Sequence, residues 1–152
     1  MGTDKFEIKS FNDKYKQQLL IVWERSVLAT HDFLTQSDFY EIKQLVQSIN
    51  FNDLQVYCLT LDELVLGFIG VADRKIEMLF IDPGYFGQGL GKSLLDFAIN
   101  ELEADKVDVN EQNVGALMFY QKTGFEIFER TDKDDQGRNY PLLRMKLKRF
   151  SS

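Results

Sequence analysis

A glycine-rich segment is the part of this sequence whose residue types and spacing most directly suggest chemistry. It reads Gly87-Gln88-Gly89-Leu90-Gly91-Lys92 and stands between an apolar stretch and a helical pattern. Backbone N–H groups at the start of a helix lack partners within the helix, and glycine lets a ligand approach the backbone closely. The helix dipole and Lys92 add positive charge. The segment predicts a phosphate-type anion site, and a tight strand-to-helix turn is the alternative explanation of its glycines.

The spacing of these glycines disfavours two common nucleotide-binding loops. A Walker A loop needs a glycine five positions before Gly91, where the sequence has Phe86. A dinucleotide-binding fingerprint needs its third glycine at position 92 or 94, and those positions hold Lys92 and Leu94. The phosphate ligand is therefore expected to belong to another class of molecule.

Composition and charge are typical of one globular domain and disfavour several functions. The chain has 152 residues, 44% of them hydrophobic, and a net charge of −6, which argues against nucleic acid or anionic membranes as partners. No apolar run approaches the ~20 residues of a membrane-spanning helix. Without a secretion-signal pattern at the start, we expect a cytoplasmic protein. The one cysteine, Cys58, lies in an apolar strand pattern and is expected in the core, not as a nucleophile or part of a metal site.

Hydrophobic periodicity predicts an α/β protein of the mixed α+β type, with one domain over residues 1–152. Strands are expected at Phe6 to Ile8 and over residues 55–60, 64–72, 75–81, 107–109, 125–131 and 142–148. Helices are expected over residues 13–28, from a cap at Ser37 to Ile49, from the glycine segment to Leu102, and over 113–123. The order is β-α-α-β-β-β-α-β-α-β-β. It implies a central, mostly antiparallel twisted sheet of about six or seven strands with about four helices.

Two motifs, in this order, resemble those of the GCN5-related N-acetyltransferase (GNAT) superfamily. The first is Leu79-Phe80-Ile81-Asp82-Pro83 followed by the glycine segment, and the second runs from Asn113 to Phe125 in the pattern N-x-x-A-x-x-F-Y-x-K-x-G-F. Residues 23–34 and 140–143 look like the bacterial YjaB-like branch. The resemblance covers nearly the whole chain. It implies an acyltransferase that moves an acetyl or other short acyl group from acyl-coenzyme A to a primary amine by direct attack.

The same resemblance implies acetyl-coenzyme A as cofactor and assigns residues to hold it. Backbone groups of the strand around Phe80 would pair with the pantetheine arm, and the N–H of Leu79 would polarise the thioester carbonyl. The glycine segment would hold the pyrophosphate. Further contacts with the cofactor would come from Ile81, Asn113, Tyr120 and Lys122. Phe86 departs from the superfamily, which usually has Arg or Gln there, but backbone N–H donors do not depend on that side chain.

Catalytic roles are implied for two further side chains. Tyr120 matches the general acid that protonates the coenzyme A thiolate, a task suited to a phenol with an ordinary pKa of about 10. A core aromatic residue is the alternative for Tyr120. Glu77 shares strand parity with Leu79 and Ile81 and is the candidate base, with an ordinary exposed carboxylate as its alternative.

The residues that would contact the acceptor amine, here called the acceptor wall, are expected in and around the segment between the first two helices. Its candidates are Trp23, Ser26, His31, Asp32 and Phe33. His31, the only histidine, titrates near neutral pH and could contact substrate, act as a base or, with Asp32, end a helix. Trp23 also fits a core position. The acidic run from Asp132 to Asp135 is either a solvated loop or a rim that attracts cations.

The acceptor itself stays open: a small-molecule amine or a peptide amine would both suit the site, and a homodimer is also compatible with the sequence. Two other functions compete with acyl transfer. A module that binds coenzyme A without turnover is favoured by Phe86, whereas Tyr120 and Asn113 favour the enzyme. A nucleotidase using the glycine segment would be stabilised by ATP with magnesium instead of coenzyme A.

Overall fold

The structure, a computed structural model, describes residues 6–148. One seven-stranded sheet runs through this part of the chain in the order β1-β2-β3-β4-β5-β7-β6. All neighbouring strands are antiparallel except β4 and β5, which run parallel. The predicted mixed sheet is therefore confirmed. The strands are β1 (Phe6–Ser10), β2 (Gln55–Leu61), β3 (Leu64–Ala72), β4 (Lys75–Ile81), β5 (Lys106–Asn110), β6 (Phe125–Thr131) and β7 (Leu142–Leu147).

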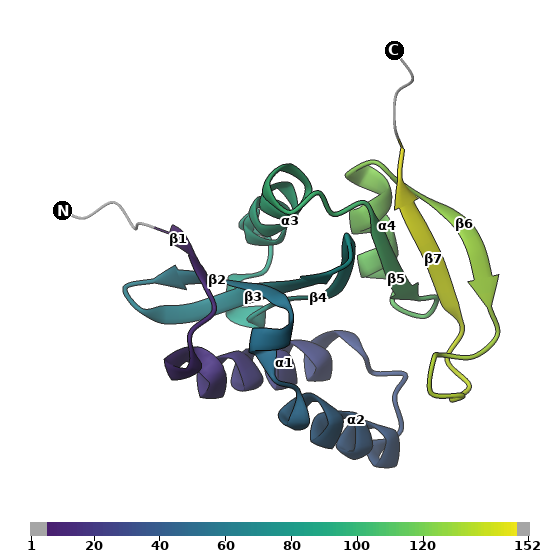
Figure 1. Cartoon of the computed structure of the whole chain (residues 1–152). Helices are drawn as coiled ribbons and strands as arrows, with labels where there is room; N and C mark the ends of the chain where they lie inside the picture. Colours follow the sequence, from purple (N-terminus) through teal and green to yellow (C-terminus); the bar gives the residue numbers. More distant parts are fainter. Residues whose placement is uncertain (1–5, 149–152) are drawn as a thin grey trace.

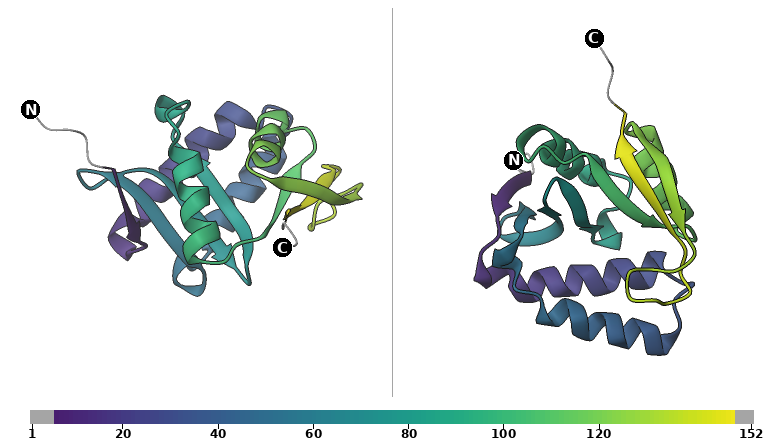
Figure 2. Two further views of the ribbon diagram at one scale, coloured as in Figure 1. Left: turned by 90° about the horizontal axis from the view of Figure 1, so that it is seen from above. Right: turned by 45° about the vertical axis from the view of Figure 1, so that its right-hand side comes forward.

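Helices cover both faces of this sheet. Helices α1 (Lys16–Thr30) and α2 (Gln36–Ser48) lie on one face, and α3 (Leu90–Glu101) and α4 (Val114–Lys122) lie on the other (Figure 1 and Figure 2). The order of strands and helices matches the prediction. In the part of the chain that the structure describes, no helix combines the length and the apolar character needed to cross a membrane.

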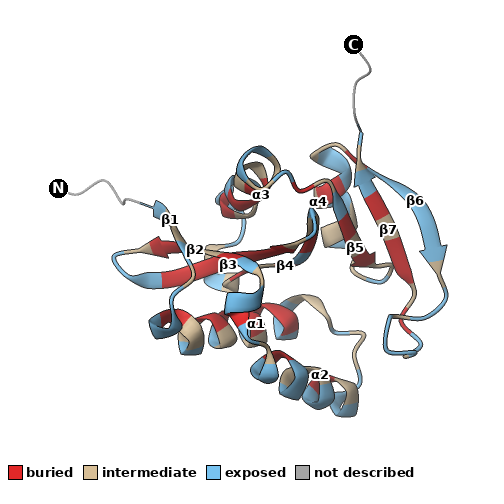
Figure 3. Cartoon of the chain, viewed as in Figure 1, coloured by how far each residue is buried: buried red, intermediate tan, exposed pale blue. Residues whose placement is uncertain are grey.

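Each face of the sheet has its own apolar core. On the α3 side, Leu94 and Leu95 pack with Met145 of β7, and all three are fully buried. On the α1 side, Trp23 stacks on Phe39 with ring centroids 5.8 Å apart. Figure 3 shows how burial concentrates on the central strands and on the helix faces turned toward them. Trp23 is only 4% exposed, so it belongs to the core, and its assignment to the acceptor wall is corrected.

The first two helices differ from the prediction at their ends. Thr35 caps α2, because its Oγ1 accepts a hydrogen bond from the Asp38 N–H at 3.1 Å and its backbone is extended. The predicted cap at Ser37 is wrong, since that residue already lies within the helix. Helix α1 continues to Thr30 instead of ending at residue 28, which brings the side chain of Thr30 next to His31.

Strand β4 contains an extra residue at Glu77. Its ladder with β3 pairs Met78 with Gly70 and Ile76 with Val71, which leaves Glu77 without an opposite residue. Residues five apart in a regular strand would lie on opposite faces of the sheet. Ile76 and Ile81 nevertheless pack in the same core, so side chains do not alternate strictly along β4. The parity used to place Glu77 beside Leu79 and Ile81 therefore does not hold.

The parallel ladder between β4 and β5 ends where the bulge begins. Its described pairs are Lys75 with Lys106 and Ile76 with Val107. Beyond Ile76, the β4 edge that faces β5 has no strand partner within residues 6–148. Free backbone donors and acceptors on such an edge need another partner, either water or a ligand.

Cys58 is expected to be inert in the folded protein. Its side chain is fully buried in β2, and burial raises the pKa of the thiol to about 12, so almost no reactive thiolate exists near neutral pH. Native protein should therefore leave a disulfide thiol reagent unreacted at about pH 8, and unfolding should release the one thiol of the chain. Rapid labelling of native protein would contradict this assignment.

Candidate functional site

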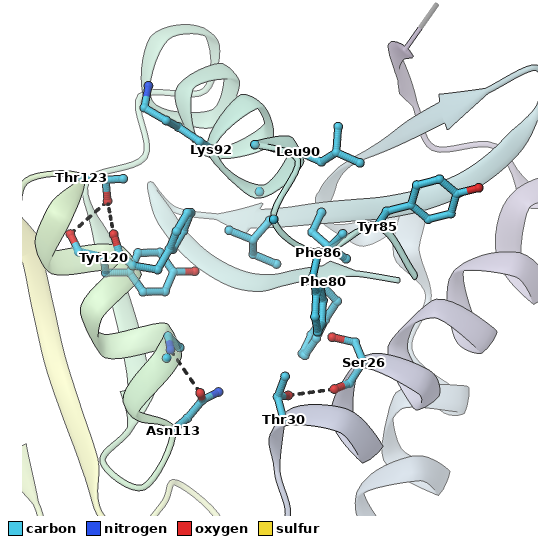
Figure 4. Close-up of a pocket in the computed structure, with 18 of the residues that line it drawn as sticks. Ser26, Thr30, Phe80, Tyr85, Phe86, Leu90, Lys92, Asn113, Tyr120 and Thr123 are labelled. Carbon is cyan, nitrogen blue, oxygen red and sulfur yellow. Dashed lines mark hydrogen bonds between the residues drawn. The ribbon is translucent and has the colours of Figure 1, made fainter. Parts of the chain in front are cut away.

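A large cavity lies where β4, the start of α3, helix α4 and the end of α1 meet (Figure 4). Its volume is about 680 Å³. Almost all residues predicted to contact a cofactor line it, although they come from distant parts of the sequence. They are Leu79, Phe80, Ile81, Gly87, Gly89, Leu90, Gly91, Lys92, Asn113, Tyr120 and Lys122. Gln88 belongs to the same loop, but it does not line the cavity.

The glycine segment forms a loop whose backbone donors are free. Gly87 and Gly89 have φ values of 79° and 77°, which favour glycine, and a Cβ at either position would meet no atom within 4 Å. None of the N–H groups from Gly87 to Lys92 donates to another described residue, and the first helical bond runs from Ser93 N to Gly89 O at 3.0 Å. The loop is thus an open array of donors at the positive end of α3.

Charge at this loop comes mainly from the backbone. Lys92 lines the cavity, but its Nζ lies 2.9 Å from Asp96 Oδ2, one helical turn away, so part of its charge is compensated. The loop is held from its other end by Asp82, whose Oδ1 accepts from the Gly84 N–H at 2.9 Å. Asp82 also pairs with Arg25 of α1 at 2.8 Å. This pair joins the loop to helix α1, and no local sequence pattern predicts it.

Helix α4 presents Asn113 and Tyr120 to the cavity. Asn113 is the N-cap, and its Oδ1 accepts from the Ala116 N–H at 3.1 Å. The Tyr120 ring packs edge-on against Phe119 and Phe125, with ring centroids 5.1 and 5.5 Å away. Both interpretations of Tyr120 therefore apply to different atoms: its ring lies in the core, while its hydroxyl points into the cavity (Figure 4).

The Tyr120 hydroxyl has no hydrogen-bond partner among residues 6–148. No fully buried side-chain oxygen or nitrogen in this range lacks a partner, so the hydroxyl must be reachable from the cavity. Burial of the residue raises the pKa of the phenol above its ordinary value. Tyr120 therefore stays protonated over the whole physiological range and retains a proton that it can donate.

A second, smaller cavity of about 210 Å³ lies between the separated ends of β4 and β5. Glu77 lines it from the bulge of β4, and Asp108 lines it from β5. Asp108 is neutralised by Lys75 at 2.6 Å and Arg144 at 2.7 Å, whereas Glu77 has no ion-pair partner within the described chain. The residues that line both cavities are His31, Leu79, Phe80, Asn113, Ala116 and Tyr120.

The predicted acceptor wall is brought together only in part. Ser26 and His31 line the first cavity, as does Thr30, which was not among the predicted site residues. Asp32 and Phe33 line neither cavity, and the Phe33 ring instead packs between those of His31 and Tyr140, at 5.2 and 5.9 Å.

Other lining residues were also missed. They are Tyr85, Phe86, Gly115, Ala116, Phe119 and Thr123. Helical spacing from Asn113 would have indicated Ala116, Phe119 and Thr123, because residues three or four apart share one face of a helix.

The acidic run between β6 and β7 lies outside both cavities. Asp132 pairs with Arg130 at 2.6 Å, and Asp135 pairs with Arg144 at 3.1 Å. These carboxylates are compensated by their own sheet, which agrees with a solvated loop and gives no support to a rim around the site.

Comparison with known proteins agrees with this geometry. Residues 13–149 match the family described as the acetyltransferase (GNAT) domain. The peptidyl-lysine N-acetyltransferase YjaB of Salmonella typhimurium is 37% identical over 129 residues, which cover 85% of this chain and 89% of that protein.

Solved structures show the same fold. The solution structure of apo-form YjaB from Escherichia coli has a TM-score of 0.86 at 32% identity and covers 94% of this chain and 97% of its own. A PaiA N-acetyltransferase from Thermoplasma acidophilum, crystallised with coenzyme A, has a TM-score of 0.73 at 19% identity, covering 93% and 99%. The chain belongs to the GNAT family of acetyl-coenzyme A-dependent N-acetyltransferases, as its two motifs predicted.

Proposed function

We propose that the protein acetylates the ε-amino group of lysine in peptides or proteins, with Tyr120 as the general acid. The observation that carries this proposal is that two cavities share Tyr120, whose hydroxyl is accessible. One cavity is rich in backbone donors and the other contains an uncompensated carboxylate. The YjaB relative of Salmonella, named for peptidyl-lysine acetylation, supports lysine as the acceptor.

The residues of the first cavity fit coenzyme A. Free N–H groups from Gly87 to Lys92, with open space at the glycines, suit a pyrophosphate. The unpaired edge of β4 from Leu79 to Ile81 suits the amide-bearing pantetheine arm. Acetyl-coenzyme A, when bound, supplies the activated thioester. A backbone N–H of β4 aimed at the thioester carbonyl is the kind of donor typically worth roughly 3–4 kcal/mol in acyl transfer.

Phe86 does not argue for a protein that binds coenzyme A without turnover. Its N–H donates to Pro83 O at 3.3 Å, and its side chain adds apolar surface to the cavity wall. Loop geometry is instead maintained by Asp82, through the Gly84 N–H and Arg25. The site thus needs no Arg or Gln at position 86 to hold the loop.

The charge and the apolar surface of the second cavity suit a lysine side chain as the acceptor. Lysine carries a compact ammonium at the end of a long apolar stem. Glu77 leaves a negative charge available there, since it has no ion-pair partner among the described residues. Ile76, Val107 and Val109 add apolar surface to the walls of this cavity. This combination matches an ammonium group on a hydrocarbon chain.

The proposal that lysine is the acceptor is tested with two matched peptides whose N-termini are blocked. One peptide contains a single lysine, and the other has arginine at that position. Mass spectrometry after incubation with acetyl-coenzyme A should show one added acetyl group on the lysine peptide only. If only free α-amino groups or small amines are acetylated, lysine is not the acceptor and the proposed function is wrong.

Replacing Gly89 by Val should abolish coenzyme A binding while the fold survives. The residue has a φ of 77°, which a β-branched side chain resists, and the new side chain would enter the phosphate loop. Gly137→Val is a matched control, because Gly137 has a φ of 80° and equally open surroundings in the β6–β7 loop. Calorimetry should detect binding to the control and none to Gly89→Val. Equal affinities for the two variants would contradict the assignment of the loop.

Replacing Tyr120 by Phe should lower turnover by about 10²- to 10⁴-fold with coenzyme A affinity kept, because only the donated proton is lost. The ring contacts with Phe119 and Phe125 remain available to the new side chain. Tyr40→Phe, on the exposed side of α2, should retain full turnover. Steady-state kinetics on the lysine peptide decides, and an unchanged kcat in Tyr120→Phe would remove this residue from the mechanism.

A further inference from the structure

His31 lies where the two cavities meet and is anchored on one side of its ring only. It follows the last residue of α1 and lines both cavities. Its Nδ1 lies 2.8 Å from Thr30 Oγ1, while its ring packs on Phe33 at 5.2 Å. His31 and Tyr120 are the two residues with titratable side chains that line both cavities.

The hydrogen bonds of Thr30 determine which nitrogen of His31 carries the proton. Thr30 Oγ1 lies 2.8 Å from the carbonyl oxygen of Ser26, which can only accept (Figure 4). A hydroxyl has one proton, so Thr30 donates it to Ser26 and can only accept from His31. Nδ1 must then be the donor, and the neutral ring carries its lone pair on Nε2.

This Nε2 is not fully buried, and it belongs to a residue that lines both cavities. It has no hydrogen-bond partner among residues 6–148, and no fully buried polar side-chain atom in this range is unpartnered. Nε2 must therefore be reachable, although most of the ring is covered. Burial lowers the pKa of His31 below its ordinary value, with Asp32 opposing this shift, so the imidazole is neutral at physiological pH.

We propose that His31, oriented by Thr30, is the base that accepts a proton from the acceptor amine at Nε2. This inference rests on the proposed acetyl transfer to an amine. An acceptor ammonium must lose two protons to become an amide nitrogen. One passes to Nε2 and then to solvent. The nitrogen lone pair then bonds to the acyl carbon while the carbon–sulfur bond breaks. Tyr120 gives its proton to sulfur and regains one from the nitrogen.

Glu77 is less suited to this task. It lines the second cavity alone and is exposed, whereas His31 lies at the junction with the cofactor cavity. A carboxylate in water is a weak base for an ammonium group, while a neutral imidazole is a stronger one. Glu77 attracts the ammonium, and His31 receives its proton.

The pH dependence of kcat/KM in His31→Gln distinguishes a catalytic base from a residue that only contributes packing. Glutamine cannot take up the proton, so kcat/KM for the lysine peptide should fall about 100-fold at about pH 7. The deficit should shrink to a few-fold at about pH 10, where free lysine begins to lose its own proton. A deficit that stays constant with pH would indicate packing alone and overturn the proposal. Asp32 acts on His31 directly, and the other charged or titratable residues that line the two cavities with it are Glu77, Tyr85, Lys92, Asp108, Tyr120 and Lys122.

Thr30→Val tests the positioning role of the hydroxyl. Loss of the Nδ1 acceptor should lower kcat by about tenfold with KM for acetyl-coenzyme A unchanged. Thr131→Val is the matched control, since that hydroxyl also donates to a backbone carbonyl, at 2.8 Å, and lies at the far end of β6. The control should keep wild-type kcat. Equal kcat values for Thr30→Val and the control would exclude an orienting role.

Nitrogen NMR of the imidazole gives a readout that needs neither cofactor nor substrate. Untagged protein has one histidine, so its two ring nitrogens are assigned without ambiguity. The wild type should show a protonated Nδ1 and a pKa below 6.5, and Thr30→Val should gain the tautomer with a protonated Nε2. A wild-type ring protonated at Nε2 would overturn the His31 proposal even if lysine acetylation proceeds. Failure to acetylate lysine would instead overturn the proposed acceptor.

Discussion

The site depends on one backbone constraint, the loss of the strand partner of β4 after Ile76. Two events coincide there: Glu77 is inserted as an extra residue against β3, and the parallel ladder with β5 ends. Strand β5 continues instead along β7, and α4 follows it, so the helix stands beside the free edge of β4. Asn113 and Tyr120 reach the same cavity as the start of α3 because of this divergence.

Burial shifts the pKa values of the two groups proposed for proton transfer, His31 and Tyr120, by a single physical cause. Removing a side chain from water favours its neutral form, which lowers the pKa of His31 and raises that of Tyr120. Both groups are therefore uncharged near neutral pH, which is what the proposed proton acceptor and proton donor require. Such opposite displacements are a common way for proteins to assign acid and base roles. In this chain both pKa shifts come from the burial of side chains that line both cavities.

Much of the fold could be predicted from local patterns. The bounds of β3, β4 and β6 were predicted as found, because apolar runs and alternation identify strands. The free donors of the glycine loop also follow from local rules for helix starts.

Features that depend on the tertiary structure could not be predicted. Nothing in the β4 sequence marks Glu77 as a bulge, since its residues alternate acceptably without one. The Arg25–Asp82 pair joins residues 57 positions apart, and the Thr30–His31 contact requires α1 to run two residues further than its apolar pattern. Trp23 was ambiguous because large aromatic residues suit both cores and binding walls.

We propose that backbone amides of the loop and of the β4 edge bind acetyl-coenzyme A. Amide NMR during titration of the protein with acetyl-coenzyme A tests it most directly. We expect the largest shifts at Gly87 to Lys92 and at Leu79 to Ile81, with little change in β6. Largest shifts in β6 or β7, or no shift at saturating ligand, would show that these amides do not bind the cofactor.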